Sequence, residues 1–361
     1  MWAPLFRVRC LRESALSARE SPNSRSVRPL AAAGDAVIHR SRKRGLRNPP
    51  PARQSQRVQV PFIGSEAVAA GLVPKHLLRS RFVALYPDVY TRPDIELNLQ
   101  HRARAAWLWS HRGGVVAGLT AAALHGARYV EDTQRIELVW SNGRAPRGLR
   151  THKQHLQPDE VTRRRGLPVT TVERTAFDLG RRGPLDAAVA RLDALGNATR
   201  FDADELLRWA KERHSGKRGM RQLVASLDLH DPGAQSPRET WLRLLLIRAG
   251  FPRPRTQIPV ISADGRRRYF LDMGWEDLKL AVEYDGDQHR VDPAQFAHDI
   301  LRSEDLDELE WTRIRVVKSN SASDVLGRVS RAYSARVRSA HGISPIRDLS
   351  ALSVQTRPPA G

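Results

Sequence analysis

The sequence is poor in cysteine and contains no long apolar run. Cys10 is the single cysteine of 361 residues, so neither an intrachain disulfide nor a metal centre built from several cysteines can form. This usage suits a reducing compartment, and we expect a cytoplasmic protein. No run of 18 apolar residues occurs, and Arg7 interrupts the apolar residues at the start, so neither a transmembrane helix nor a signal peptide is predicted.

Acidic residues are scarce relative to basic ones. Sixty Lys and Arg residues stand against 39 Asp and Glu residues, which gives a formal net charge of +21. Residues 1–60 hold thirteen of these cations and three acids, so the other 301 residues carry +11. An excess of this sign predicts a polyanionic partner, most simply nucleic acid. The alternative is a basic surface that only keeps the chain soluble.

Changes in composition divide the chain into five parts. Residues 1–57 are rich in Arg, Ser, Pro and Ala and show no helical or strand period, which predicts a disordered basic extension. This extension is either an arm that holds DNA phosphates or a flexible segment without such a role. Three ordered parts are predicted at 58–92, at 93–232 and, after a Pro-Gly break, at 233–342. Residues 343–361 are predicted to form a flexible tail.

Residues 62–90 predict a helix, a turn, a second helix and a hairpin. Gly71 suits the position that follows a first helix, and Pro74 suits the first turn of a second helix. The Pro87-Asp88 pair suits the turn of a hairpin over 82–90. Helix, helix and hairpin in this order form the outline of a winged helix, in which the second helix enters a DNA major groove.

The middle part is predicted to mix helices with a strand. Leu97 to Ser110, Asp186 to Leu195 and Asp202 to Lys211 show helical patterns, and Ile136 to Trp140 alternates as a strand. Its loops carry basic residues that either contact phosphates or are only solvated, namely Arg144, Arg147, Arg150, Lys153 and Arg163 to Arg165.

Residues 62–92 resemble the winged-helix start of AbiEi-type antitoxin proteins. The stretches Val115 to Gly126 and Leu167 to Leu179 also fit that family. Because those proteins bind DNA through the winged helix, the resemblance implies that DNA is contacted by Lys75, His76, Arg79 and Arg81. The alternative is an internal scaffold whose basic residues are solvated. A toxin–antitoxin partner or a DNA-repair partner is compatible with this resemblance.

The part from 233 onward is predicted to be one mixed sheet with helices on its faces. Ser236 as N-cap, Pro237 at the first helical position and Glu239 at the third form a capping box for a helix that ends at Gly250. Three strands are expected over 257–260, 268–273 and 279–285, followed by a helix to about residue 310 and a strand over 311–317. The chain as a whole is therefore predicted to be α+β.

Acidic side chains gather around the second and third of these strands. If the two strands pair around a turn at 275–278, Asp272 and Glu283 are cross-strand neighbours, with Cβ atoms about 4.5–5.5 Å apart. Two carboxylates at this spacing suit Mg²⁺ or Mn²⁺, which can polarise a phosphodiester. Asp285 projects to the same side as Glu283 and can join them as a metal ligand. His289 follows the strand as a candidate base or acid.

The string from Glu283 to His289, with Asp272 before it, resembles the PD-(D/E)XK nuclease superfamily. Within it, residues 236–340 are most similar to domain of unknown function 559, an endonuclease-like domain related to very-short-patch repair enzymes. The resemblance implies a restriction-endonuclease-like fold and Mg²⁺-dependent cleavage, with Asp272 and Glu283 as ligands and Glu239 as a helical acid. Asp285 stands where the superfamily usually has a lysine. His289 is the predicted substitute, because the related repair enzymes use histidine.

Two functions follow from these features. The first is a Mg²⁺-dependent DNA endonuclease with an N-terminal DNA-binding region, which the set Asp272, Glu283 and His289 favours. The second is a non-catalytic DNA-binding regulator of the antitoxin type whose nuclease-like domain is degenerate. Glu239 is explained equally well as a helix cap, and RNA is an alternative substrate for the enzyme.

Overall fold

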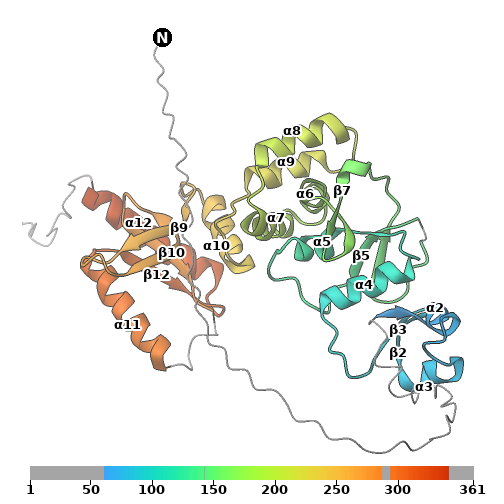
Figure 1. Ribbon diagram of the computed structural model, residues 1–361. Coiled ribbons are helices and arrows are strands. Elements are labelled where there is room, and N and C mark those ends of the chain that lie inside the picture. Colours follow the sequence, from blue (N-terminus) through green and yellow to red (C-terminus); the bar gives the residue numbers. More distant parts are fainter. Residues whose placement is uncertain (1–60, 142, 287–292, 341–361) are drawn as a thin grey trace, which may run out of the picture. The chain divides into compact units, whose positions relative to one another are not determined.

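The structure is a computed structural model that describes residues 61–141, 143–286 and 293–340. Within these ranges three sheets and the helices around them form the mixed α+β architecture that the sequence predicts (Figure 1). The extension predicted at 1–57 and the tail predicted at 343–361 lie outside the described residues, as does His289. No helix in the described ranges has both the length and the apolar character needed to cross a bilayer.

The first ordered elements form a small three-stranded sheet with two helical segments. In chain order they are β1 (Phe62–Ile63), α2 (Gly64–Ala69), the 3-10 turn η1 (Lys75–Leu77), α3 (Leu78–Arg81), β2 (Val83–Tyr86) and β3 (Val89–Thr91). The strand order is β1-β3-β2, so β1 adds a third strand to the hairpin β2–β3. Phe62 and Ile63, which were predicted to begin the first helix, form a strand instead, because they pair with β3.

A five-stranded mixed sheet follows, in the order β6-β5-β4-β8-β7. Its strands are β4 (Val115–Val116), β5 (Ile136–Val139), β6 (Leu149–His152), β7 (Val161–Arg164) and β8 (Leu167–Thr170). The strand predicted at Ile136 is confirmed as β5. The other four strands, which have two or four residues each, were not predicted.

Helices of the middle part pack on this sheet and on one another. They are α4 (Leu99–Trp109), α5 (Gly118–Leu124), α6 (Val172–Gly180), α7 (Leu185–Thr199), α8 (Ala203–His214) and α9 (Met220–Asp228). The three predicted helices are confirmed as α4, α7 and α8. Side chains cap several of the starts: Asn98 accepts an N–H at the start of α4, Thr171 at α6 and Asp202 at α8. These caps decide where the helices begin, and with them where α6 places its arginines.

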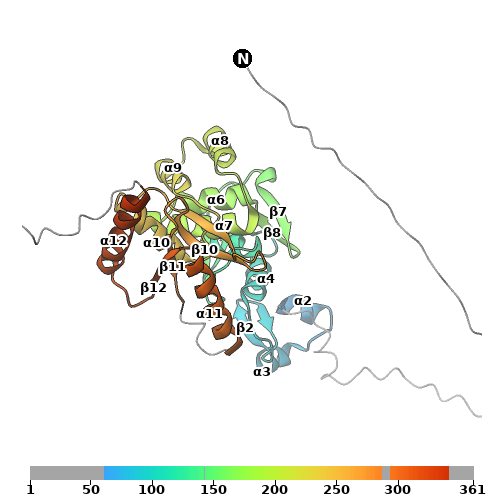
Figure 2. The same cartoon turned by 90° about the vertical axis from the view of Figure 1, so that its left-hand side faces the viewer.

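The C-terminal part has the predicted order of helix, three strands, helix, strand and helix. Its elements are α10 (Pro237–Arg248), β9 (Arg255–Ile261), β10 (Arg268–Trp275), β11 (Leu280–Tyr284), α11 (Pro293–Glu308), β12 (Thr312–Val316) and α12 (Ala322–Ala340). The strand order is β12-β11-β10-β9, and only the pair β11–β12 is parallel within the described sheet. The sheet lies between α12 and α11 in the ribbon views of Figure 1 and Figure 2.

Two layers of apolar side chains hold this sheet. Leu242 of α10 and Val325 of α12 pack with Val282 on one face, and Leu306 of α11 packs with Leu271 on the other. The start of α10 is as predicted, because the Ser236 hydroxyl accepts the Glu239 N–H at 3.2 Å. Because α10 packs on the two inner strands, Glu239 at its start lies near Asp272 of β10.

Helix α10 also packs on the middle part of the chain. Arg243 donates to Asp193 of α7 at 2.8 Å, and the two side chains are 0% and 1% exposed. Thr240 donates to the same carboxylate at 2.8 Å. A buried ion pair that lost one partner would leave an uncompensated charge, so this contact specifies how α10 meets α7.

Candidate functional site

The four basic residues that were predicted to contact DNA lie on one short helical segment. Lys75 and His76 belong to η1, and Arg79 and Arg81 belong to α3; all four are exposed. Leu78 of the same segment is buried with Val73 and Phe82 in a small apolar core. The segment is thus anchored through its apolar side chains and presents its cations to solvent. Within the described residues none of the four has an acidic partner.

The hairpin beside this segment is tied down at its turn. Asp88 adopts a φ of 59°, and its carbonyl accepts the Gly64 N–H at 2.8 Å. The Asp88 side chain also accepts the Ser65 N–H at 3.0 Å. A groove of about 560 Å³ is lined by Arg79, the hairpin and Arg147. The structure therefore brings Arg147, which the sequence marked only as a loop cation, next to the predicted DNA-binding segment.

Asp272 and Glu283 face each other across two strands. The register pairs Met273 with Val282, which places Asp272 opposite Glu283, as the sequence predicts. The Tyr284 N–H donates to the Asp272 carboxylate at 2.8 Å. The pKa of Asp272 is raised to about 7, first by burial and then by the carboxylates of Glu239 and Glu283, against the opposing effects of the Tyr284 N–H and Arg302. The acidic cluster is thus short of positive charge.

The other acids of this region have donors from within the protein. Glu283 pairs with Arg302 of α11, and Asp285 pairs with Arg315 of β12. Glu239 accepts the Gln235 N–H at 2.8 Å and the Ser236 hydroxyl at 2.9 Å, so it caps α10 while lying near Asp272. Burial raises the pKa of Glu239 and outweighs these two hydrogen bonds.

This donor set fits a divalent cation in its central pair. Asp272 and Glu283 are carboxylates of the kind that Mg²⁺ or Mn²⁺ takes, and a cation would relieve the repulsion that raises the pKa of Asp272. In the described ranges, however, no three His, Cys, Asp or Glu side chains are arranged to hold a metal. The ligand role of Asp285 stays a prediction. So does the role of His289, which lies outside the described residues.

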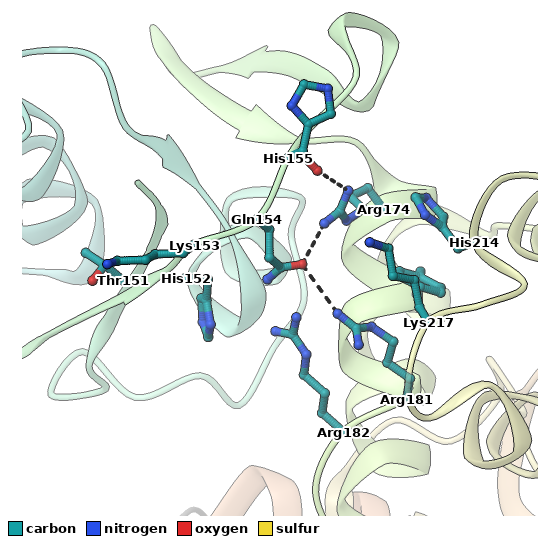
Figure 3. Close-up of a pocket in the computed structure, with 11 residues that line it drawn as sticks. Thr151, His152, Lys153, Gln154, His155, Arg174, Arg181, Arg182, His214 and Lys217 are labelled. Carbon is teal, nitrogen blue, oxygen red and sulfur yellow. Dashed lines mark hydrogen bonds between the residues drawn. The ribbon is translucent and has the colours of Figure 1, made fainter. Parts of the chain in front are cut away.

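A basic pocket in the middle part was not predicted. Its volume is about 430 Å³, and Figure 3 shows the side chains that line it, drawn from the chain after β6, from α6 and from the end of α8. Lys153 is the one lining residue that the sequence had marked as a candidate for phosphate contact. The available signal was the spacing in α6, because Arg174, Arg181 and Arg182 stand three or four residues from Asp178 and surround it.

Comparisons with known proteins agree with one of the two resemblances. Residues 115–228 match the model of the AbiEi antitoxin C-terminal domain. The uncharacterized protein MT2308 of Mycobacterium tuberculosis (strain CDC 1551 / Oshkosh) is 32% identical over 208 residues, which are 57% of this chain and 75% of that protein. The uncharacterized protein Rv2248 of Mycobacterium tuberculosis (strain ATCC 25618 / H37Rv) is similar to the same extent.

Among solved structures, that of the RV2827C protein from Mycobacterium tuberculosis superposes with a TM-score of 0.37 and 15% identity, over 60% of this chain and 89% of that one. The predicted likeness of the middle part to AbiEi antitoxins is confirmed by the family match. The likeness of residues 236–340 to nucleases stays a prediction.

Proposed function

We propose that this chain, which belongs to the same family as the mycobacterial proteins MT2308 and Rv2248, is a DNA-binding regulator of the antitoxin type. Residues 115–228 match the AbiEi antitoxin C-terminal domain, and the resemblance of residues 62–92 adds the DNA-binding winged helix. One observation carries the DNA contact: Lys75, His76, Arg79 and Arg81 are exposed together on the segment that corresponds to the groove-binding helix. The antitoxin domain implies a toxin as protein partner.

The electrostatics of this segment suit contact with a duplex. Cations without an acidic partner replace the counterions condensed on DNA, and the release of those counterions supplies most of the sequence-independent affinity. Arg147 lines the same groove as Arg79, so it would contact the same backbone. The hairpin turn at Asp88 is fixed to α2 through Gly64 and Ser65. Leu78 of the helical segment packs with Phe82 and Tyr90 in one apolar core, so the hairpin and the segment would meet DNA as one surface.

Fluorescence anisotropy with a labelled duplex from upstream of the gene that encodes this chain tests the proposal. We expect the triple variant Lys75→Gln, Arg79→Gln, Arg81→Gln to bind at least tenfold more weakly than the wild type. The slope of log K against log salt should flatten by about 0.9 for each phosphate contact that is lost. Both effects follow from the removal of charges that carry no structural ion pair.

The matched control removes three exposed cations of α8 and α9 in the variant Arg208→Gln, Lys211→Gln, Arg221→Gln. This variant has the same net charge as the first, so it should keep wild-type affinity if binding is local. Equal weakening by both variants would show binding through overall charge. If the first variant bound with wild-type affinity, the winged helix would not be part of the DNA interface.

A second candidate function is a DNA endonuclease, and the position of Asp272 between Glu239 and Glu283 favours it. Mg²⁺ or Mn²⁺, held by Asp272 and Glu283, would polarise a phosphodiester and lower the pKa of an attacking water. Within the chain, Arg302 orients Glu283, and the cap at Ser236 orients Glu239. Both functions belong to this protein if the same chain binds and cuts DNA.

Nicking of supercoiled DNA in Mg²⁺ or Mn²⁺, compared with EDTA, separates the two candidates. We expect Asp272→Asn and Glu283→Gln to abolish any metal-dependent nicking, whereas Glu304→Gln, an exposed acid on α11, should leave it intact. Nicking that survives both substitutions would belong to another site or to a contaminant. A wild-type chain that binds the upstream duplex but nicks no DNA or RNA substrate would support the regulator and contradict the endonuclease.

A further inference from the structure

The basic pocket of the middle part gathers cations around one amide. Arg174 and Arg181 both donate to the Gln154 Oε1, at 2.7 and 3.3 Å. In Figure 3 the guanidinium group of Arg182 and the ammonium group of Lys217 also point toward Gln154. Four positively charged groups from α6, from the residue pair that follows it and from the segment between α8 and α9 therefore line one space.

The acids beneath these groups do not balance them. Asp178 accepts from Arg174 at 3.0 Å and from Arg181 at 2.8 Å, forms an ion pair with Arg182 at 3.0 Å, and is 3% exposed. Glu160, which is 1% exposed, pairs with Arg174 at 2.8 Å. Glu137 also acts on Arg182, so four cations meet three carboxylates. All four cations line the cavity, whereas Asp178, Glu160 and Glu137 do not.

Two of the four cations retain free donors. Arg174 and Arg181 spend their donors on Asp178, Gln154 and backbone carbonyls. Arg182 makes a single ion pair through one nitrogen, and Lys217 has no ion pair among the described residues. An arginine has five N–H donors and a lysine has three, so most of the donors of this pair remain available to a ligand.

The environment of Arg182 shows that positive charge is crowded here. The pKa of Arg182 is lowered first by burial, and the charges of Arg181 and Arg174 lower it further, against the opposing effects of Asp178 and Glu137. Such a guanidinium stays protonated, because its ordinary pKa is above 12. An anion placed against it would relieve the repulsion between the three arginines.

We propose that this pocket binds a small phosphorylated ligand, with its phosphoryl oxygens on Arg182 and Lys217. Planar guanidinium groups match phosphate oxygens through paired hydrogen bonds, and a lysine adds a mobile point charge. The volume of about 430 Å³ exceeds that of a single phosphate and falls in the range of pockets that enclose small molecules. Phe177 and His214, whose rings stack at 4.5 Å, close one side of the pocket, and Phe177 is itself only 1% exposed.

Isothermal titration calorimetry on the full chain, at constant ionic strength, tests this site with three probes: inorganic phosphate, pyrophosphate and adenosine triphosphate. We expect saturable binding of at least one probe. Equal affinity for pyrophosphate and the nucleotide would show that the phosphate groups alone are recognised, and tighter binding of the nucleotide would show that its ring or sugar contributes. Both results support the site.

The double variant Arg182→Gln, Lys217→Gln should bind the probe at least tenfold more weakly. Asp178 keeps Arg174 and Arg181 in this variant, so its melting temperature should stay close to that of the wild type. The matched control, Arg208→Gln with Lys211→Gln on α8, changes the net charge equally and should bind as the wild type does.

Three results would overturn the proposal: no saturable binding of any probe, equal binding by the double variant, or loss of duplex DNA binding in the double variant with no small-molecule binding by the wild type. The last result would assign the pocket to DNA. The winged-helix triple variant separates this site from the proposed function, because it should keep full affinity for the small probe while losing DNA.

Discussion

Asp178 in the basic pocket and Asp272 in the C-terminal sheet are both largely buried aspartates, yet their pKa values move in opposite directions. Burial alone would raise the pKa of Asp178, but Arg174, Arg182 and Arg181 outweigh it and hold that pKa below its ordinary value. Burial raises the pKa of Asp272, and the neighbouring Glu239 and Glu283 add to the effect. Burial raises the pKa in both cases, and the arginines around Asp178 account for the opposite outcome there.

The difference separates the roles that the two regions can take. A carboxylate that is charged beneath several arginines acts as a platform that holds them in place and presents their free donors to solvent. A carboxyl group beside other carboxylates is instead ready to accept a proton or a cation. The two proposals follow from this difference: an anion is proposed for the middle part and a cation for the C-terminal sheet.

The largest expected effect comes from replacing Asp178, the carboxylate that holds the arginines in place. Asp178→Asn should destabilise the chain by about 3–5 kcal/mol at neutral pH, because it leaves buried arginines uncompensated. The pKa of Asp178 is lowered in the folded chain. Its stabilising contribution is therefore fully present above about pH 4, the pKa of an aspartate in the unfolded chain, and is lost as the pH falls further. Urea denaturation at several pH values measures both.

The matched control for this loss is Asp159→Asn. Asp159 pairs with Arg213, and the two side chains are 56% and 42% exposed, so its removal should cost about 0–1 kcal/mol. Equal losses for both substitutions would mean that the arginines of the pocket do not depend on Asp178.

The second effect has the opposite sign. Asp272→Asn mimics the protonated acid and keeps an acceptor for the Tyr284 N–H, so in EDTA it should stabilise the chain above pH 7. A folded pKa of about 7 against 3.8 places the upper limit near 4 kcal/mol. The penalty carried by the wild type grows as the pH rises from about 4 to 7, so the two proteins should have similar stability at pH 4. Stabilisation that does not vary with pH would contradict the raised pKa.

A smaller effect tests the two roles of Glu239. Ser236→Ala removes the cap of α10 and should cost about 1 kcal/mol in urea denaturation. Ser334→Ala, an exposed serine of α12, provides the control and should be nearly neutral. If Glu239 serves only as a cap, nicking activity should be unchanged in the Ser236→Ala variant. A loss of nicking without a matching loss of stability would show that the cap orients Glu239 for another task.

The smallest effect is expected at Asp285. Its partner Arg315 is 62% exposed, so a double-mutant cycle of Asp285→Asn and Arg315→Gln should give a coupling energy of about 0–1 kcal/mol. A coupling well above this range would place Asp285 in the central acidic network. Such a result would strengthen its predicted role as a ligand.

Local features of the fold were predictable because their causes are local. The cap of α10 depends on Ser236, Pro237 and Glu239, which are neighbours in the chain. The pairing of Asp272 with Glu283 depends on a short turn between two strands, which leaves little freedom in the register. The strand at Phe62 was missed because its partner is the later hairpin, whereas its own residues suit a helix as well.

The sequence by itself determined the α+β class, the order of elements in the C-terminal sheet, the basic segment from Lys75 to Arg81 and the facing pair Asp272 and Glu283. Each depends on short-range periodicity, capping or turn length. Only the tertiary structure decided that Arg302 meets Glu283 and that Lys217 meets the arginines beside Asp178. Those contacts join residues that are far apart in the chain. Their electrostatics depend on burial and on distances in space, which chain folding sets and composition does not contain.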